Sequence, residues 1–332
     1  MQAVKALLCK EHGPSSGLVV EDIAPPPISK DAVRIAVHAA GVNFPDTLII
    51  EGKYQFQPPL PFAPGGEVSG EIMEVGKDVT TLSVGDRVMG LTGWGGFAEE
   101  AVVPSSKCFR MPDGMDYPTA AVFGMTYGTV AHALIQRAAL RSGETLLVHG
   151  ATGGVGTAAI EVGRCMGATV IATGGKADKL AVLKEAYDVA ETLDTSAEKP
   201  LKDAVKKLTK GRGADVIFDP VGGEVFEQSL RCINWNGRLL VVGFASGTIP
   251  SARANLMLLK GSAVVGVFWG AFATKEPKRN AANFSQLFSW YGDGKLVPRI
   301  SHRFTLAEGG KAIQALVDRE VVGKAVVIVR EG

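Results

Sequence analysis

The feature that most constrains this chain is the glycine-rich stretch at residues 146–159, which reads LLVHGATGGVGTAA. An apolar run typical of a buried strand passes through clustered glycines into an alanine-rich run typical of a helix. Such glycines permit a tight turn, a close approach of backbone N–H groups to a pyrophosphate, and close packing of the helix on the strand. The stretch therefore predicts a dinucleotide site, with a simple strand-to-helix turn as the alternative. The predicted contacts are Ala151, Thr152, Gly153, Gly154, Val155 and Gly156.

The segments around this stretch predict an α/β fold. From residue 145 to about 268, runs rich in Val, Ile and Leu alternate with helical patterns, which indicates parallel strands covered by helices on both faces. Before residue 110 the chain instead shows short β-like runs between turn residues, typical of a closed, largely antiparallel domain. Short β-like units return near the end. With 332 residues we expect two domains, the parallel one inserted between two halves of the other.

The end of the second predicted strand indicates which nucleotide is bound. An NAD site places a carboxylate there, about 20 residues after the glycines, to accept the ribose hydroxyls. Here residues 173–175 read TGG, and lysines follow at once. Ammonium groups favour a 2′-phosphate, so we expect NADPH; the alternatives are that the lysines only solvate a helix start, or that Asp178 serves a ribose. The predicted contacts are Gly175, Lys176 and Lys179.

Composition excludes several classes of partner. The chain carries a net charge of +1 without charged runs, so neither nucleic acid nor a membrane surface is expected. No apolar run reaches the roughly 20 residues of a spanning helix, and the first residues do not resemble a signal peptide, so we expect a cytoplasmic protein. The 4 cysteines lie far apart and predict no zinc site or disulfide framework.

Six motifs together resemble the medium-chain dehydrogenase/reductases, and within them the quinone oxidoreductase, or zeta-crystallin-like, branch. The resemblance spans the whole chain and implies a Rossmann doubly wound parallel sheet inserted between two halves of a GroES-like β-domain. It places the GroES-like domain at residues 1–122 and 268–332 and the Rossmann NADP(H)-binding domain at 123–267. The motifs are GVNFPDTLIIEGKY, LPFAPGGEVSGEIMEVG, GDRVMG, GATGGVG, GADVIFDPVGG and LVVGFASGTIP.

Departures from the zinc-dependent relatives indicate the chemistry. Those relatives carry a catalytic Cys where this chain has Asn43, a zinc-binding His where it has Gly66, and a four-cysteine lobe that is missing here. An amide and a glycine cannot complete a tetrahedral zinc site, so we expect no metal. Alcohol oxidation then lacks its Lewis acid. Hydride transfer to a quinone or enone remains feasible, because it needs alignment and hydrogen bonds to the developing oxyanion.

The resemblance also implies residues around the reacting groups. As candidate catalytic residues it marks Asn43 as a partner of the nicotinamide ribose or substrate carbonyl, Asp46 beside it, and Tyr54 in the acceptor pocket as a candidate proton donor. The alternatives are an Asx turn or helix cap for the first two and a half-buried aromatic holding a loop for Tyr54.

Further cofactor contacts come from three other segments. Thr126 resembles a threonine near the phosphates, with a helix cap as the alternative. Two loops follow late strands, where ligands of such sheets collect, and Trp269 in the second could instead be core packing. The predicted contacts of these loops are Phe244, Ala245, Ser246, Phe268, Trp269 and Gly270.

The sequence thus favours a zinc-independent, NADPH-dependent reductase of quinones or related conjugated carbonyls, NADPH:quinone oxidoreductase. Its nearest rival is an enoyl-thioester or 2-alkenal double-bond reductase on the same fold. A third hypothesis is an RNA-binding or structural zeta-crystallin-like protein, against which the near-neutral charge argues. The resemblance also implies a homodimer, in which the strand at residues 262–268 would lie at a sheet edge and pair with its twin.

Overall fold

A computed structural model of the chain describes residues 3–187, 189–197 and 200–330. The chain forms two compact units. Unit 1 comprises Met1–Met125 and Pro298–Gly332, and unit 2 comprises Thr126–Val297. Unit 2 is therefore inserted between two segments of unit 1, and it includes residues 268–297, which the sequence-based division assigned to the other domain.

Unit 2 is built on a parallel sheet. Among the described residues its strand order is β10-β9-β8-β11-β12-β13, and every neighbouring pair is parallel. The order runs outward from β8 and β11 in opposite directions, which is the arrangement of a doubly wound dinucleotide fold. The predicted Rossmann sheet is confirmed. Its strands are β8 (Thr145–Val148), β9 (Thr169–Gly174), β10 (Glu191–Asp194), β11 (Ala214–Asp219), β12 (Ile233–Val241) and β13 (Ala263–Gly266).

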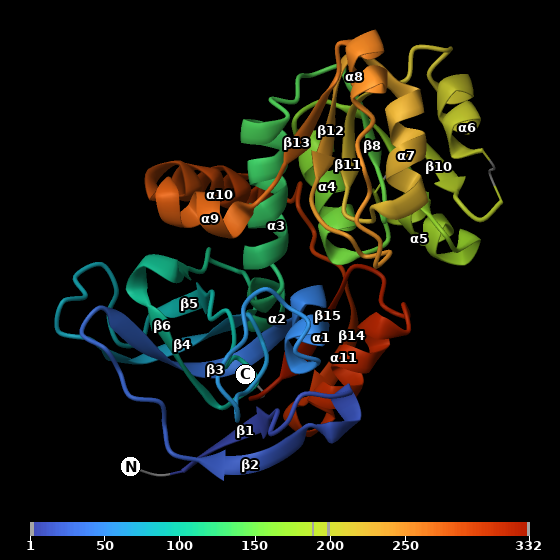
Figure 1. Cartoon of the computed structure of the whole chain (residues 1–332). Coiled ribbons are helices and arrows are strands. Elements are labelled where there is room, and N and C mark those ends of the chain that lie inside the picture. Colours follow the sequence, from blue (N-terminus) through green and yellow to red (C-terminus); the bar gives the residue numbers. More distant parts are fainter. Residues whose placement is uncertain (1–2, 188, 198–199, 331–332) are drawn as a thin grey trace. The chain divides into compact units, whose positions relative to one another are not determined.

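Helices cover both faces of this sheet (Figure 1). Neighbouring residues of β8 point to opposite faces: Leu147 packs in a cluster with Phe226 of α7, whereas Leu146 lies against Gly163 of α4. This period of two explains why the strands are apolar throughout. The helices between residues 124 and 292, which include those on the two faces, are α3 (Gly124–Ala131), continued by a π-helix at His132–Arg137, then α4 (Gly154–Cys165), α5 (Ala177–Tyr187), α6 (Leu201–Leu208), α7 (Gly223–Cys232), α8 (Ala254–Lys260), α9 (Trp269–Lys275) and α10 (Pro277–Gly292).

Unit 1 is largely antiparallel, as predicted. In the described part of the chain its main sheet has the order β14-β15-β3-β4-β5-β7, with β6 also on β3, and β1 pairs with β2 separately. Among the residues of unit 1 that the structure describes, only β14 and β15 pair in parallel. The strands are β1 (Val4–Leu8), β2 (Val19–Ile23), β3 (Ala32–Val42), β4 (Glu67–Val75), β5 (Arg87–Gly90), β6 (Glu100–Pro104), β7 (Cys108–Arg110), β14 (Ile300–Thr305) and β15 (Lys324–Ile328).

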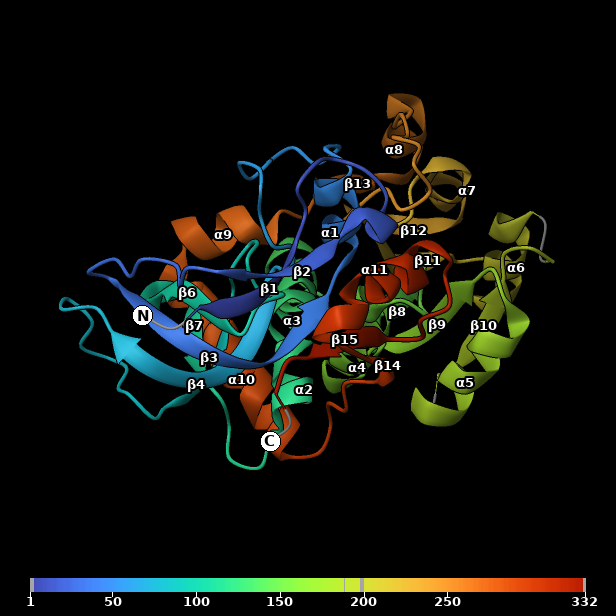
Figure 2. The same cartoon turned by 90° about the horizontal axis from the view of Figure 1, so that it is seen from below.

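Strand β3 is the central strand of the main sheet, because it pairs with β4, β6 and β15. It runs beside β4 over most of its length, and its other edge is shared by β6 and β15, so the C-terminal strand completes a sheet begun by the N-terminal segment (Figure 1 and Figure 2). Its side chains join a core capped by two helices, α1 and α11. The helices of the unit are α1 (Phe44–Ile50), α2 (Tyr117–Ala121) and α11 (Gly309–Val317), with 3-10 turns at Ser15–Gly17, Ser105–Lys107 and Leu306–Glu308.

Candidate functional site

The glycine stretch forms the turn between β8 and α4. Gly150 adopts a φ of +56°, a left-handed conformation that favours glycine. A Cβ at Gly156 would lie 2.3 Å from Gly150 O, so only glycine lets the helix begin this close to the turn. At Gly153, which precedes α4, the nearest atom to an added Cβ is 3.5 Å away. The turn therefore leaves room beside the first N–H groups of a 12-residue helix, where an anion is stabilised.

Alanine at residue 151, within the glycine-rich turn, is explained by its surroundings. Ala151 is fully buried and its N–H donates to Thr173 O at 2.9 Å, which ties the turn to the end of β9. The left-handed conformation falls one residue earlier, on Gly150. A methyl group at residue 151 is thus compatible with the turn.

A buried histidine, just before the glycine turn, connects the end of β8 to β9 and α7. His149 Nδ1 lies 2.8 Å from Thr173 Oγ1, and Nε2 lies 2.8 Å from Ser229 Oγ on α7. Because the Ser229 hydroxyl donates to Val225 O, the imidazole Nε2–H donates to Ser229 and Nδ1 accepts from Thr173. Burial lowers the pKa of His149, which keeps the ring neutral as this arrangement requires. Sequence reasoning passed over this residue, although a lone polar side chain closing an apolar strand was a signal.

The end of β9 meets the glycine turn. A Cβ at Gly174 would lie 3.4 Å from the Thr152 methyl group, so the two predicted halves of the nucleotide site are adjacent. Gly175 and Lys176 are exposed in the turn that follows, and Lys179 lies half-buried on α5. No carboxylate ends β9, as the sequence indicated. The structure therefore brings the predicted phosphate turn and the predicted 2′-phosphate lysines to one corner of unit 2.

The loop after β12 is fastened to the turn after β11. Ala245 N donates to Pro220 O at 3.0 Å and Ser246 N donates to Val221 O at 2.9 Å. Asp219 holds that turn, because its Oδ1 accepts from Val221 N at 2.8 Å and Gly222 N at 3.0 Å. Phe244, Ala245 and Ser246 are exposed at the carboxyl edge of the sheet, the edge where ligands of such sheets collect.

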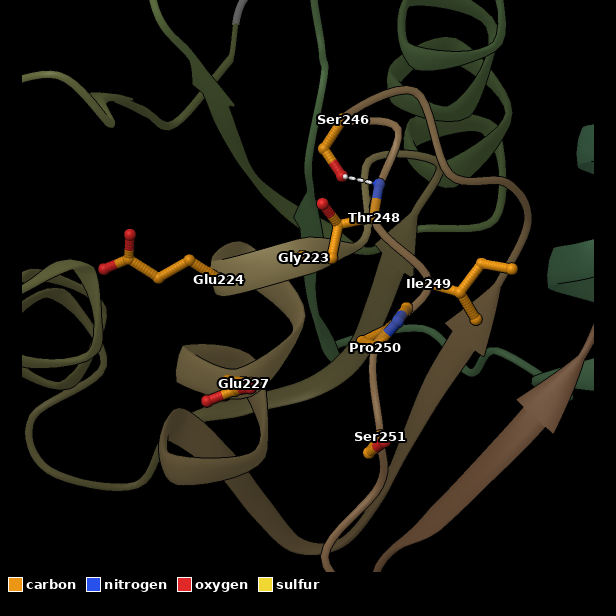
Figure 3. A pocket seen from close by; sticks show the side chains of 8 residues that line it. All are labelled: Gly223, Glu224, Glu227, Ser246, Thr248, Ile249, Pro250 and Ser251. Carbon is orange, nitrogen blue, oxygen red and sulfur yellow. Dashed lines mark hydrogen bonds between the residues drawn. The ribbon is translucent and has the colours of Figure 1, made fainter.

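A shallow hollow of about 440 Å³ lies between this loop and the start of α7 (Figure 3). Ser246 Oγ accepts there from Thr248 N at 3.3 Å, while Glu224 and Glu227 line the opposite side. The two carboxylates give its lining a negative charge. Its lining is Gly223, Glu224, Glu227, Ser246, Thr248, Ile249, Pro250 and Ser251.

Trp269 is built into the core of unit 2. Its Nε1–H donates to Asn280 Oδ1 at 2.9 Å, and its ring packs so closely on α3 that a Cβ at Gly128 would lie 2.4 Å from it. The core-packing alternative thus describes its side chain. Phe268 and Gly270, on either side, are exposed, whereas Thr126 is buried in the third position of α3.

In unit 1, Asn43 lies between β3 and α1, with its amide engaged inside the protein. Its Nδ2 donates to Glu67 Oε1 at 2.9 Å and to Gly41 O at 3.4 Å, and its Oδ1 accepts from Lys324 Nζ at 2.5 Å. Both amide hydrogens thus have internal acceptors. In this arrangement Asn43 can offer a substrate carbonyl no donor unless the network rearranges.

Asp46 ties the start of α1 to the loop before β4. Its Oδ2 accepts from Asn43 N at 2.8 Å and its Oδ1 from Gly65 N at 3.0 Å. Burial raises the pKa of the carboxyl group to about 6, against the lowering effect of these hydrogen bonds. The helix-cap alternative therefore describes the contacts of Asp46. Tyr54 is half-buried against the core of unit 1, and burial, then the charge of Asp46, raises the pKa of its phenol, which stays protonated at neutral pH.

Two ionic residues that sequence reasoning did not select complete this network. Glu67 begins β4 and Lys324 begins β15, and their charged groups lie 3.1 Å apart with both side chains buried. Lys324 Nζ also donates to Val42 O at 2.9 Å, and Glu67 Oε2 accepts from Met125 N at 2.8 Å. A lone charge opening an apolar strand, as in KAVVIV, was the available signal.

The position of the relatives' zinc-binding histidine is filled differently. A Cβ at Gly66 would lie 3.0 Å from the Met125 methyl group, so an apolar side chain occupies the room next to it. Within the described residues, no group of three or more His, Cys, Asp or Glu side chains is arranged to hold a metal ion. Searched over the same residues, no helix has the length and apolar character needed to cross a membrane.

Comparison with known proteins agrees with this architecture. Residues 29–113 match the family model described as alcohol dehydrogenase GroES-like domain, and residues 154–287 match the one described as zinc-binding dehydrogenase. Quinone oxidoreductase-like protein 2 homolog of Nematostella vectensis is 42% identical over 98% of this chain and 89% of its own length. Quinone oxidoreductase of Pseudomonas aeruginosa is 34% identical over 96% and 97%. A mycobacterial protein solved with NADPH superposes with a TM-score of 0.90, at 29% identity, covering 98% of this chain and 100% of that one.

Proposed function

Because the chain belongs to the medium-chain dehydrogenase/reductase superfamily, in its quinone oxidoreductase branch, we propose that it is a zinc-independent reductase that uses NADPH to reduce quinones or related conjugated carbonyls. The observation that carries the proposal is the corner of unit 2 where the glycine turn meets the end of β9. A relative of the same fold was crystallised with NADPH, and relatives at 34–42% identity are named for quinone reduction or likeness to it.

The residues of this corner fit a phosphorylated dinucleotide. The open face at Gly153 and the start of α4 would receive the pyrophosphate, and Lys176 and Lys179 would attract the 2′-phosphate. No carboxylate ends β9 to accept the ribose hydroxyls of NADH. The exposed residues Phe244 to Ser246 and Phe268 would border the nicotinamide end. When bound, NADPH supplies the hydride.

The acceptor side of the proposal depends on residues of unit 1. With Asn43 and Gly66 at the positions of the relatives' metal ligands, we propose that no Lewis acid takes part. Asn43, Asp46 and the buried ion pair then act as a rigid support for the loop that carries Tyr54. Tyr54, whose phenol stays protonated, is the candidate to donate a hydrogen bond or a proton to the reduced carbonyl.

Tyr54 also favours the second candidate function, reduction of a double bond in an enoyl-thioester or 2-alkenal. That reaction needs a proton at the α-carbon, whereas a reduced quinone can take its protons from water. Tyr54→Phe should lower kcat for alkenals or enoyl-CoA esters by orders of magnitude if the phenol is the acid, and should leave naphthoquinone reduction within a few-fold.

The test of the function is a screen of NADPH oxidation against benzoquinones, naphthoquinones, alkenals and enoyl-CoA esters. NADH in place of NADPH tests the lysines, and Lys176→Ala with Lys179→Ala should raise the KM for NADPH at least tenfold while leaving that for NADH nearly unchanged. An alcohol with NADP⁺ is the control. Rapid alcohol oxidation, or activity abolished by a zinc chelator, would refute the metal-free reaction.

We further propose that the protein is a homodimer formed through β13. This strand ends the sheet order of unit 2, and an edge strand offers N–H and C=O groups to a twin. Val265→Pro, within β13, should shift the mass measured by light scattering from dimer to monomer. An unchanged dimer would place the interface elsewhere.

A further inference from the structure

Glu161 of α4 makes hydrogen bonds to residues near both ends of unit 2. The chain leaves unit 1 after Met125 and returns to it after Val297. The Glu161 carboxylate accepts a hydrogen bond from the hydroxyl of Tyr127, just after the first connection, and Oε1 accepts from Val297 N at 2.6 Å, at the second. One side chain therefore joins two segments that are 170 positions apart in the sequence, 297 less 127.

We propose that Glu161 is a proton-controlled clasp on these two connections, closed when its carboxyl group is neutral and loosened when it is ionised. The Glu161 carboxyl group can make hydrogen bonds to both partners in either protonation state. A carboxylate accepts from both partners, whereas a neutral carboxyl group can donate its proton to the Tyr127 oxygen and still accept from Val297 N. Both states are satisfied while the clasp is closed, but only the ionised state gains by opening to water.

The surroundings of Glu161 favour the neutral form. The side chain is buried, and burial raises its pKa to about 7 despite its two hydrogen bonds. No ion pair of Glu161 is found in the described part of the chain. Tyr127 of α3 and Arg164 of α4 act on Glu161 directly. The titratable groups around these contacts are Cys165 of α4 and Tyr187 of α5, which act on Tyr127, and Asp293 and Lys295, which act on Cys165.

The sign of the pH effect follows from linkage. When the clasp opens to water, the pKa of Glu161 falls from about 7 toward its ordinary value of 4.5. The closed state therefore holds the proton across this interval, and opening becomes about tenfold more favourable for each pH unit from roughly 5 to 7. Above pH 7 the effect levels off, so mild acidification tightens the clasp.

Hydrogen exchange measures this opening directly, without cofactor or acceptor, so its outcome is independent of the proposed function. Mass spectrometry of peptides covering residues 290–300 would follow the Val297 amide between pH 5 and 8.5, after correction for the intrinsic rate. The protection factor in the wild-type chain should fall by at least tenfold from pH 5 to 7.5. Peptides from the core of unit 1 should not share this change.

Glu161→Gln tests the role of the carboxyl proton, because glutamine has nearly the same shape but does not titrate. The amide oxygen can accept from Val297 N and the amide N–H can donate to Tyr127, so protection should be independent of pH and equal to that of the wild-type chain at pH 5. Glu185→Gln, the same change at an exposed site on α5, should keep the wild-type profile. A variant Glu161→Gln that retains the wild-type pH profile would overturn the proposal.

Tyr127→Phe keeps the proposal testable if Glu161→Gln does not fold. Without the phenol, one side of the clasp is lost, so protection at residues 290–300 should fall severalfold at pH 5, while the pH dependence persists. A flat profile in both the wild-type and Tyr127→Phe chains would also refute the clasp.

Discussion

The buried ion pair of unit 1 allows a quantitative prediction. Lys324 Nζ donates to Val42 O, Asn43 Oδ1 and Glu67 Oε1 at 2.9, 2.5 and 3.1 Å, so each of its three hydrogens has an acceptor. Lys324→Met keeps the apolar stem and removes the charge. Glu67 is then left buried with a charge and no cation, and breaking a buried pair in this way costs about 3–5 kcal/mol.

The reverse change distinguishes the ion pair from its hydrogen bonds. The side chain of Glu67→Gln can still accept hydrogen bonds from Asn43 and Lys324. Its N–H group, however, faces Met125 N, which in the wild-type chain donates to Glu67 Oε2 at 2.8 Å. An unsatisfied buried donor costs about 1–3 kcal/mol, to which the unpaired lysine adds. In the double variant neither charge is stranded, so its cost should be smaller than the sum by about 2 kcal/mol.

Urea unfolding followed by circular dichroism would measure these free energies. Lys311→Met is the matched control, because its partner is Glu308 on the surface and its side chain is 75% exposed; it should change stability by less than about 0.5 kcal/mol. If Lys324→Met lies within about 1 kcal/mol of the wild-type chain, or if the two single changes are additive, the ion pair does not hold unit 1 together as argued.

Four further changes test other parts of the structure. Gly156→Ala places a Cβ 2.3 Å from a backbone oxygen and should abolish NADPH binding in calorimetry together with a loss of stability. Gly153→Ala, with 3.5 Å of room, should melt like the wild-type chain and lose only NADPH affinity, so equal stability losses in both would refute the assignment of their roles. Burial raises the pKa of Asp46 from 3.8 to about 6, so its contribution to stability is full below pH 3.8 and is lost as pH rises through 6. Asp46→Asn should therefore remove about 2 kcal/mol of the stability difference between urea melts at pH 4 and 7.5, and an unchanged difference would contradict this. Trp269→Phe strands Asn280 Oδ1 and should cost about 1–3 kcal/mol while NADPH affinity, measured by calorimetry, stays nearly the same.

The features that sequence reasoning identified correctly are local or periodic. The strand–turn–helix at residues 146–159 and the alternation around it predicted the doubly wound sheet, because a turn of bare glycines and continuous apolar strands admit few other arrangements. Short elements were missed or shifted: α9 was not expected, and β12 begins at Ile233, before the apolar run that marked it. Such elements are held by packing rather than by their own pattern.

The roles of individual polar residues depended on partners that no local pattern reveals. Asn43 and Asp46 were assigned to chemistry from their position in a motif, yet their contacts join β3, β4, α1 and β15. Trp269 belongs to a predicted ligand loop, and its side chain packs into unit 2. These outcomes follow from which side chains the fold brings together, and the motif specified only where the backbone turns.

By itself, the sequence determined the family, the two-part organisation and the glycine turn that would receive a nucleotide, since these follow from backbone freedom and from apolar periodicity within tens of residues. Only the tertiary structure decided which partners the buried ionisable side chains find. Glu67 and Lys324 are 257 residues apart in the chain, and Glu161 and Val297 are 136 apart. A buried charge must find its partner in space because water no longer solvates it, and that partner is set by how the sheets and helices assemble.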